Sequence, residues 1–189
     1  MDLKKINIAV FISGTGSNLK NLINYSLKKN SKFKIMLIIS NNAKAKGLDY
    51  AKKFKIKKKF INYSILRNAE SKILIELKKN NIQVICLAGF MKVLSKDLIK
   101  NFKGKIINIH PSLLPKYKGL NTHQRAINNK EKYSGCTVHY VTSKLDSGKI
   151  ILQEKVRISK KDSAKILAKK ILNKEHKLYP KALLKVFNL

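Results

Sequence analysis

Residues 6–18 read INIAVFISGTGSN, an apolar run that ends in a glycine-rich turn. A short, nearly continuous apolar run of this kind predicts a strand that is buried on both faces. The Ser, Gly and Asn residues that follow it predict a turn into a helix. A buried strand, a turn and a helix together form the opening unit of an α/β fold.

Strand-like and helix-like segments continue to alternate along the first two thirds of the chain. Short runs rich in Ile and Val predict strands at 6–12, 33–39, 58–61, 82–88 and 106–109. The stretches between and after them have helical spacing and predict helices at about 18–29, 45–54, 68–80, 95–102 and 122–128. Buried strands separated by helices indicate a parallel sheet with helices on both faces.

The last third of the chain has a different pattern. Two strand-like runs, 136–141 and 150–156, are joined only by a loop, which predicts an antiparallel pair. A closing helix is expected from 162 to about 187, and Pro180 is expected to break or kink it. The length suits one core, so we predict a single domain over residues 1–189, with a Rossmann-like, mostly parallel α/β sheet and an antiparallel C-terminal strand pair.

The charge of the chain is strongly positive, with a formal net charge of +32 at pH 7. Only three of its 42 basic residues are arginine, and the lysines are spread over nearly every segment. Lys, Asn and Ile all have A/T-rich codons, so we interpret the charge mainly as compositional drift. Sites that read phosphate or base geometry favour arginine, so we predict no specific nucleic-acid partner. A lysine-rich RNA-binding α/β protein remains the non-enzyme alternative.

The sequence also predicts where the protein works. The amino terminus lacks the pattern of a signal peptide, and the longest apolar runs fall well short of the roughly 20 residues of a membrane helix. We therefore expect a cytoplasmic protein with no membrane partner. Cys86 and Cys136 lie in apolar runs and form no CxxC pair, so both are expected to be buried free thiols.

The turn after the first strand carries a candidate anion site. Backbone N–H groups and hydroxyls gather there at a helix amino terminus, an arrangement that favours phosphate. The turn lacks the last glycine of a dinucleotide fingerprint and the Gly-Lys-Ser/Thr of a P-loop, so a phosphomonoester is the better prediction. An ordinary glycine turn capped by Ser17 remains the other interpretation.

Residues 105–115 read KIINIHPSLLP, a buried strand followed by a stiff turn. Alternate side chains of a strand face the same way, so Asn108 and His110 are expected to project together at its carboxyl end. An amide and an imidazole there favour a site that activates a carbonyl, although each could simply hydrogen-bond at a strand end. Asp146 would favour the imidazolium form of His110 if it reached that ring, and otherwise is a turn residue.

Residues 87–94 read LAGFMKVL, where a buried strand opens into an apolar turn. Open α/β sheets bind ligands at the carboxyl ends of their strands, so this turn could wall a flat aromatic pocket. The other interpretation is ordinary core.

Taken together, four motifs resemble those of the phosphoribosylglycinamide formyltransferase family: SGTGSN at 13–18, LAGFM at 87–91, NIHPSLLP at 108–115 and LDSG at 145–148. The resemblance covers essentially the whole chain and implies the formyltransferase fold. It also implies transfer of the formyl group of 10-formyltetrahydrofolate to the amine of N1-(5-phospho-β-D-ribosyl)glycinamide in purine (IMP) biosynthesis. No metal is expected, the expected partners are the two small-molecule substrates, and the protein is expected to be a monomer or homodimer.

The resemblance assigns roles by position. Asn108 would hydrogen-bond the formyl oxygen, His110 would stabilise the oxyanion and move the proton, and Asp146 would keep His110 protonated. The phosphoribosyl substrate would bind at Gly14, Thr15, Gly16, Ser17, Asn18 and Glu175. The folate would bind at Arg67, Met91, Lys92, Val93, Leu94 and Asn108, with backbone near 140–146 closing the pterin pocket.

Two positions depart from the family pattern, and they leave the loop after residue 115 uncertain. Asn121 stands where many relatives carry histidine, and Lys118 where proline or arginine is usual. The remaining histidines have unremarkable predicted places: His123 in the first turn of a helix, His139 in a strand near the pocket, and His176 on a helix surface.

A methionyl-tRNA formyltransferase-like enzyme is the nearest alternative, because it shares the Asn, His and Asp set. Such proteins look longer, with a carboxyl-terminal nucleic-acid domain, and their first loop does not read SGTGSN. A formyltetrahydrofolate hydrolase would carry an additional amino-terminal domain.

Overall fold

The computed structural model describes residues 5–188 and divides the chain into two compact units, Met1–Ile107 and Asn108–Leu189. The boundary falls inside one strand, β5 (Lys105–His110). The single domain expected over 1–189 therefore stays a prediction.

The first unit is built on a parallel sheet. Its strands have the hydrogen-bonded order β3-β2-β1-β4-β5, with β1 (Ile6–Ile12), β2 (Phe33–Ser40), β3 (Lys57–Phe60) and β4 (Val84–Leu87). β1 runs parallel to both β2 and β4, and β2 runs parallel to β3. Residues 8–12 have no exposed surface at all, which explains why this strand reads as a continuous apolar run.

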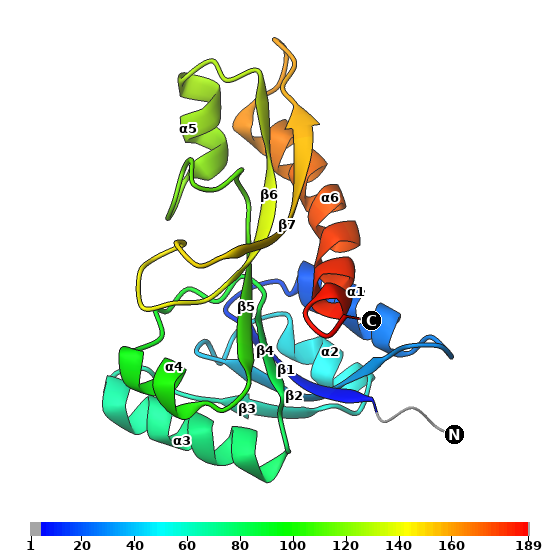
Figure 1. The fold of residues 1–189 in the computed structure, drawn as a ribbon, viewed down its shortest axis with the longest axis vertical. Helices are drawn as coiled ribbons and strands as arrows, with labels where there is room; N and C mark the ends of the chain where they lie inside the picture. Colours follow the sequence, from blue (N-terminus) through cyan, green and yellow to red (C-terminus); the bar gives the residue numbers. More distant parts are fainter. Residues whose placement is uncertain (1–4, 189) are drawn as a thin grey trace. The chain divides into compact units, whose positions relative to one another are not determined.

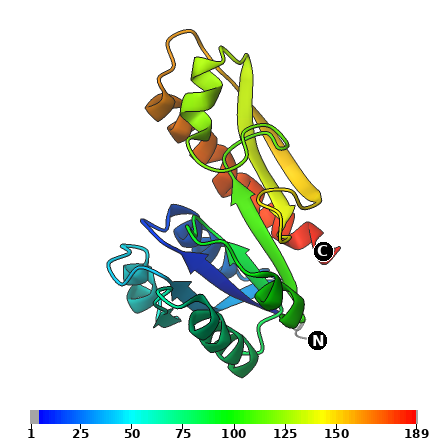
Figure 2. The same ribbon diagram turned by 90° about the vertical axis from the view of Figure 1, so that its left-hand side faces the viewer.

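Helices cover both faces of this sheet. They are α1 (Ser17–Ser26), α2 (Leu48–Lys53), α3 (Leu66–Lys79) and α4 (Lys96–Asn101). The strand order moves outward from β1 to β3 and then returns to β4 on the other side of β1. Right-handed crossovers therefore place α1 and α2 on one face and α3 and α4 on the other, where α3 and α4 lie side by side (Figure 2).

The second unit contains the predicted antiparallel pair, β6 (Tyr133–Tyr140) and β7 (Ile150–Arg157). The helix α6 (Ala164–Lys185) packs along both strands and also contacts α5 (Thr122–Asn128) (Figure 1). The β6–β7 register shifts at one point: Val138 pairs with Leu152, but the next residue, His139, pairs with Ile150. Such an irregularity re-aims the side chains beside it.

The α/β fold, with its mostly parallel sheet and antiparallel C-terminal pair, is confirmed. The expected break at Pro180 is wrong, since α6 continues through this residue to Lys185. The other expectation, a kink at Pro180, stays a prediction. Pro180 is buried, together with Leu178 and Tyr179 on the same helix. Tertiary packing therefore holds the helix together where the proline removes one backbone donor.

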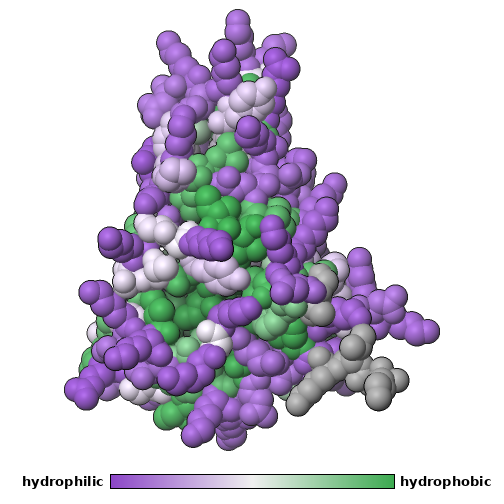
Figure 3. All heavy atoms as spheres, in the orientation of Figure 1, coloured by the Kyte–Doolittle hydropathy of each residue, from purple (hydrophilic) through white to green (hydrophobic). Residues whose placement is uncertain are grey.

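Hydrophilic residues cover much of the molecular face in Figure 3, with smaller apolar areas between them. Both cysteines are buried, as predicted, and burial raises the pKa of the Cys136 thiol to about 12. A thiol with so little thiolate is a structural residue and not a nucleophile.

Candidate active site

His110 and Asp146 lie side by side in the second unit. The Nδ1 atom of His110 is 3.4 Å from the Oδ2 atom of Asp146, and both side chains are less than a tenth exposed. The other ring nitrogen of His110, Nε2, is 2.8 Å from the carbonyl oxygen of Tyr117. Carboxylate and carbonyl oxygens both accept hydrogen bonds, and only a doubly protonated imidazole can donate to both of them. The surroundings of His110 therefore suit an imidazolium.

The Asp146 carboxylate is held by backbone on one side. Its Oδ2 atom accepts a hydrogen bond of 2.8 Å from the N–H of Gly119. Both residues have left-handed backbone conformations, with φ of 46° at Asp146 and 76° at Gly119. Asp and Gly are among the residues that adopt this region most readily. The tip of the β6–β7 connection and the loop after β5 are thus joined through the carboxylate itself.

The loop after β5 is fixed to the β6–β7 pair by buried polar contacts. The hydroxyl of Thr137 donates to the Ser112 carbonyl at 2.6 Å and accepts from the Leu114 N–H at 3.1 Å. The Gln153 amide donates to the Leu114 carbonyl at 2.8 Å. These bonds satisfy backbone groups that a proline-containing segment cannot place in a sheet ladder.

The two departures from the family pattern have clear places in this loop. Asn121 has a left-handed backbone, with φ of 56°, immediately before α5, and asparagine tolerates this conformation well. The Lys118 carbonyl accepts a hydrogen bond from Arg125 at 2.7 Å, and its ammonium contacts the Ser147 hydroxyl. Both residues are therefore accommodated by local bonding.

His139 adds a fourth side chain to the cluster of Asn108, His110 and Asp146. The sequence pattern placed His139 only near the pocket. Its Nε2 atom is 3.2 Å from Nδ2 of Asn108 and 3.7 Å from Oδ1 of Asp146. Its Nδ1 atom is 2.8 Å from the carbonyl oxygen of Tyr140. Burial is the main cause that lowers the pKa of His139, and the nearby Asp146 and the Tyr140 carbonyl only partly offset it. The 3.7 Å contact with Asp146 is therefore made by a neutral ring and is not an ion pair at neutral pH.

The predicted phosphate loop, 13–18, lies in the first unit between β1 and α1. Gly16 is buried, has a φ of 72° and immediately precedes α1. A Cβ atom at this position would lie 2.8 Å from the Cα of Gly47, so only glycine fits without a backbone shift. The N–H of Gly47 in turn donates to the Gly14 carbonyl at 3.0 Å. The loop is therefore a close-packed turn that opens a helix, as an anion cradle requires.

Ser13 connects the phosphate loop to the predicted folate loop through both its hydroxyl and its backbone N–H. The Met91 N–H donates to the Ser13 hydroxyl at 2.8 Å, and that hydroxyl donates to the Asn41 side chain at 2.5 Å. The Ser13 N–H also donates to the Gly89 carbonyl at 3.1 Å. Residues 13–18 and 89–91 are therefore neighbours at the carboxyl ends of β1 and β4.

The predicted folate residues include unusually exposed apolar groups. Met91 is 62% exposed and Val93 is 64% exposed, while Leu94 is buried. Beside them the Phe90 ring packs edge-on against Tyr63, with ring centroids 5.6 Å apart. Exposed apolar groups on a structured turn are a surface that a ligand or a partner could cover, so the predicted folate role of this turn stays a prediction. The remaining predicted folate residues, Arg67 and Lys92, are both exposed.

Glu175 lies on α6 in the second unit and is only 7% exposed. Its charge contributes to the raised pKa of the Cys136 thiol, which places it next to β6. Buried carboxylates are uncommon in proteins unless they are paired, and Glu175 does have an interaction partner. Its neighbour His176 is half-buried, so the predicted place on the helix surface is only partly right; burial lowers the pKa of this histidine.

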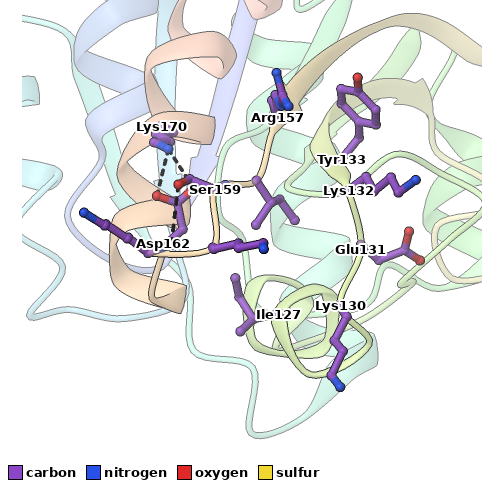
Figure 4. A pocket seen from close by; sticks show the side chains of 12 residues that line it. Ile127, Lys130, Glu131, Lys132, Tyr133, Arg157, Ser159, Asp162 and Lys170 are labelled. Atoms are coloured by element: carbon purple, nitrogen blue, oxygen red, sulfur yellow. Dashed lines mark hydrogen bonds and ion pairs between the residues drawn. The ribbon is translucent and has the colours of Figure 1, made fainter.

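A groove of about 1110 Å³ lies elsewhere in the second unit, where β6 begins and β7 ends (Figure 4). Its acidic groups are already paired: Asp162 with Lys170 at 2.6 Å, and Glu131 with Lys116 at 2.8 Å. None of the predicted site residues lines it. The groove is therefore lined by more basic than acidic side chains, and it is not the predicted active site.

Between residues 5 and 188 no group of three or more His, Cys, Asp and Glu side chains is arranged to hold a metal ion. Over the same described residues, none of the helices combines the length and apolarity that crossing a bilayer would need.

Comparison with known proteins identifies the family. Residues 6–183 match the family model described as formyl transferase. Phosphoribosylglycinamide formyltransferase of Haemophilus influenzae is 42% identical over 179 residues, which cover 92% of this chain and 83% of that protein. The trifunctional purine biosynthetic protein adenosine-3 of Homo sapiens is 43% identical over 183 residues, but the chain spans only 18% of its length.

A solved structure agrees with the sequence comparison. The crystal structure of phosphoribosylglycinamide formyltransferase from Brucella melitensis has a TM-score of 0.91 and 40% sequence identity, covering 97% of this chain and 96% of that one. The two proteins therefore share both the fold and a large part of the amino-acid sequence over nearly their whole lengths. The chain therefore belongs to the formyl transferase family.

Proposed function

We propose that this protein transfers the formyl group of 10-formyltetrahydrofolate to the amine of glycinamide ribonucleotide, as a phosphoribosylglycinamide formyltransferase. The observation that carries the proposal is the cluster at the end of β5, where the Asp146 carboxylate lies 3.4 Å from the His110 ring and Asn108 lies on the same strand. Relatives of similar length that carry this enzyme's name support the choice of substrate.

The reaction needs a donor at the carbonyl oxygen. When an amine attacks a formyl carbon, negative charge develops on the oxygen. Asn108 has one amide N–H that makes no hydrogen bond in the described part of the chain, and this group can donate to that oxygen. The Nε2 atom of His110 lies 2.8 Å from the Tyr117 carbonyl, so the ring would reach the formyl oxygen only by exchanging that contact for one with the substrate. A fixed donor aimed at such an oxygen lowers the barrier by about 3–4 kcal/mol.

Asp146 would keep His110 ready for this role. A carboxylate 3.4 Å from Nδ1 favours the charged ring and fixes its orientation. Once the new C–N bond forms, the attacking nitrogen carries an additional proton, and the nitrogen of the donor must receive one as its bond to the formyl carbon breaks. His110, with Asp146 behind it, is the group in this cluster that can move that proton.

The two predicted binding loops supply the remaining parts. Residues 14–18 offer backbone donors at the start of α1 to a substrate phosphate, and Glu175 would bind the ribose. Folate supplies the formyl group, and its flat pterin would cover the exposed apolar turn at 91–94, with Arg67 and Lys92 available to its carboxylates. We further propose that the protein is cytoplasmic, has no specific nucleic-acid partner, and acts as a monomer or homodimer.

A coupled assay tests the proposal. Purified protein is mixed with glycinamide ribonucleotide and 10-formyltetrahydrofolate, and the change in folate absorbance is followed. We expect turnover that depends on both substrates and falls roughly 100-fold or more in His110→Ala. Formylation of methionyl-tRNA with no turnover of glycinamide ribonucleotide would replace the proposal with the tRNA enzyme. Release of formate without an amine acceptor would indicate a hydrolase.

A further inference from the structure

The Asn108 side chain has two ends that would act in opposite ways on a carbonyl substrate. Its Nδ2 group donates hydrogen bonds and its Oδ1 atom only accepts them. Activation of a formyl oxygen requires the donor end. Some neighbouring group must therefore decide which end of the amide faces the substrate, because a planar amide fits almost equally well when turned by 180°.

His139 is that neighbour, and its own orientation is decided by backbone. The Tyr140 carbonyl, 2.8 Å from Nδ1, can only accept, so Nδ1 carries the proton. In a neutral ring the other nitrogen, Nε2, then has a lone pair and no hydrogen. Nε2 lies 3.2 Å from the Asn108 amide and can only accept from its Nδ2 group.

We propose that His139 is a positioning residue that accepts a hydrogen bond from Asn108 and so sets the donor end of that amide toward the reacting carbonyl. This inference rests on the proposed function, in which Asn108 binds the formyl oxygen. One N–H of Asn108 is used by His139, and the second is left for the substrate. His139 itself touches no reacting atom in this arrangement.

The surroundings of His139 keep its ring in the required form. The side chain is 2% exposed, and burial lowers its pKa. Two ionisable groups face it: Asp146, with Oδ1 3.7 Å from Nε2, and the ring of His110. Asp146 favours protonation of His139 and His110 opposes it. Because Asp146 is shared with His110 and held by the Gly119 N–H, the balance leaves His139 neutral near pH 7.

Protonation of His139 would reverse this arrangement. A hydrogen on Nε2 would point toward Asn108 and Asp146, and the amide would have to present Oδ1 instead of Nδ2. The donor end would then be lost from the substrate. The proposal thus predicts an acid limb in kcat that belongs to His139, separate from any effect of pH on substrate binding.

Three variants test the proposal. His139→Leu removes the acceptor, and we expect kcat to fall roughly 10- to 100-fold while both KM values change little. His139→Gln restores an uncharged acceptor that does not titrate, so kcat should recover partly and its acid limb should flatten. Val138→Ala shortens the buried side chain at the neighbouring position of β6 and controls for general loosening of the strand.

The wild-type protein offers a test that does not depend on folding of any variant. Nitrogen NMR of labelled histidine should show the Nδ1–H tautomer for His139 at pH 7, even without substrate. An Nε2–H tautomer, or an unchanged kcat in a folded His139→Leu protein, would overturn the proposal. Absence of transformylase activity in the wild type would instead remove the proposed function, and the NMR result would still report whether the hydrogen bond exists.

Discussion

Replacing Gly16 by alanine should weaken nucleotide binding through the backbone of the phosphate loop. Gly16 has a φ of 72°, a region that costs a residue with a Cβ about 1–2 kcal/mol. The new methyl would also lie 2.8 Å from the Gly47 Cα, so backbone must move. If one charge-assisted hydrogen bond to phosphate is lost, about 1.5–3 kcal/mol of binding disappears, equivalent to a KM roughly 10- to 150-fold higher.

The assay measures both substrate constants and the stability of the variant. We expect the KM for glycinamide ribonucleotide to rise, the KM for the folate to change much less, and the free energy of unfolding to fall by at least about 1 kcal/mol. Gly14→Ala is the matched control for stability, since a Cβ there meets nothing within 4 Å. A folate constant that rises while the nucleotide constant stays fixed would show that the two pockets are misassigned, and no change in either would reduce the loop to a turn.

Three further expectations follow from the site and the surface. Asp146→Asn should lower kcat roughly 100-fold with little change in substrate affinity, measured by steady-state kinetics, and equal kcat would remove the carboxylate from the mechanism. Burial lowers the pKa of His123, His139 and His176 in the folded protein. The unfolded state therefore binds more protons as the pH falls through about 6.5, and the folded state should lose stability in that direction. Melting temperatures measured between pH 7.5 and 5.5 check this expectation. RNA binding should be weak near 0.15 M salt and steeply salt-dependent, and tight binding insensitive to salt in a filter assay would contradict the interpretation of the charge as drift.

Much of the fold could be predicted because local pattern and burial agree. The first strand was expected at 6–12 and is found there, since its apolar run is bounded by a polar turn on one side. β6 begins at Tyr133 and not near Cys136, because pairing of Tyr133 with Arg157 extends a strand whose sequence there is polar and contains glycine. Tertiary pairing decided this boundary, and no local signal carries it.

The candidate site was also predicted only in part. The alternation of Asn108 and His110 along one strand was visible in the sequence. The partner of Asn108 was not, because the place of His139 depends on the shifted register between β6 and β7. A histidine inside a strand has no sequence signal that tells a structural ring from a positioning one. The available signal was its position seven residues before Asp146, in the strand that leads into the connection carrying that residue.

The left-handed backbone at Asp146 has an evolutionary consequence. A φ of 46° is tolerated by Asp, Asn and Gly far better than by other residues, so conformation alone leaves few replacements at this position. Asn is one of them, and a single G-to-A change in the codon produces it, in the same direction as the compositional bias of this lysine- and asparagine-rich chain. The backbone conformation offers no barrier to that mutation, although the mutation would remove the carboxylate charge beside His110. If drift toward A and T shaped this composition, selection on the carboxylate itself, and not the backbone conformation, would keep an aspartate here.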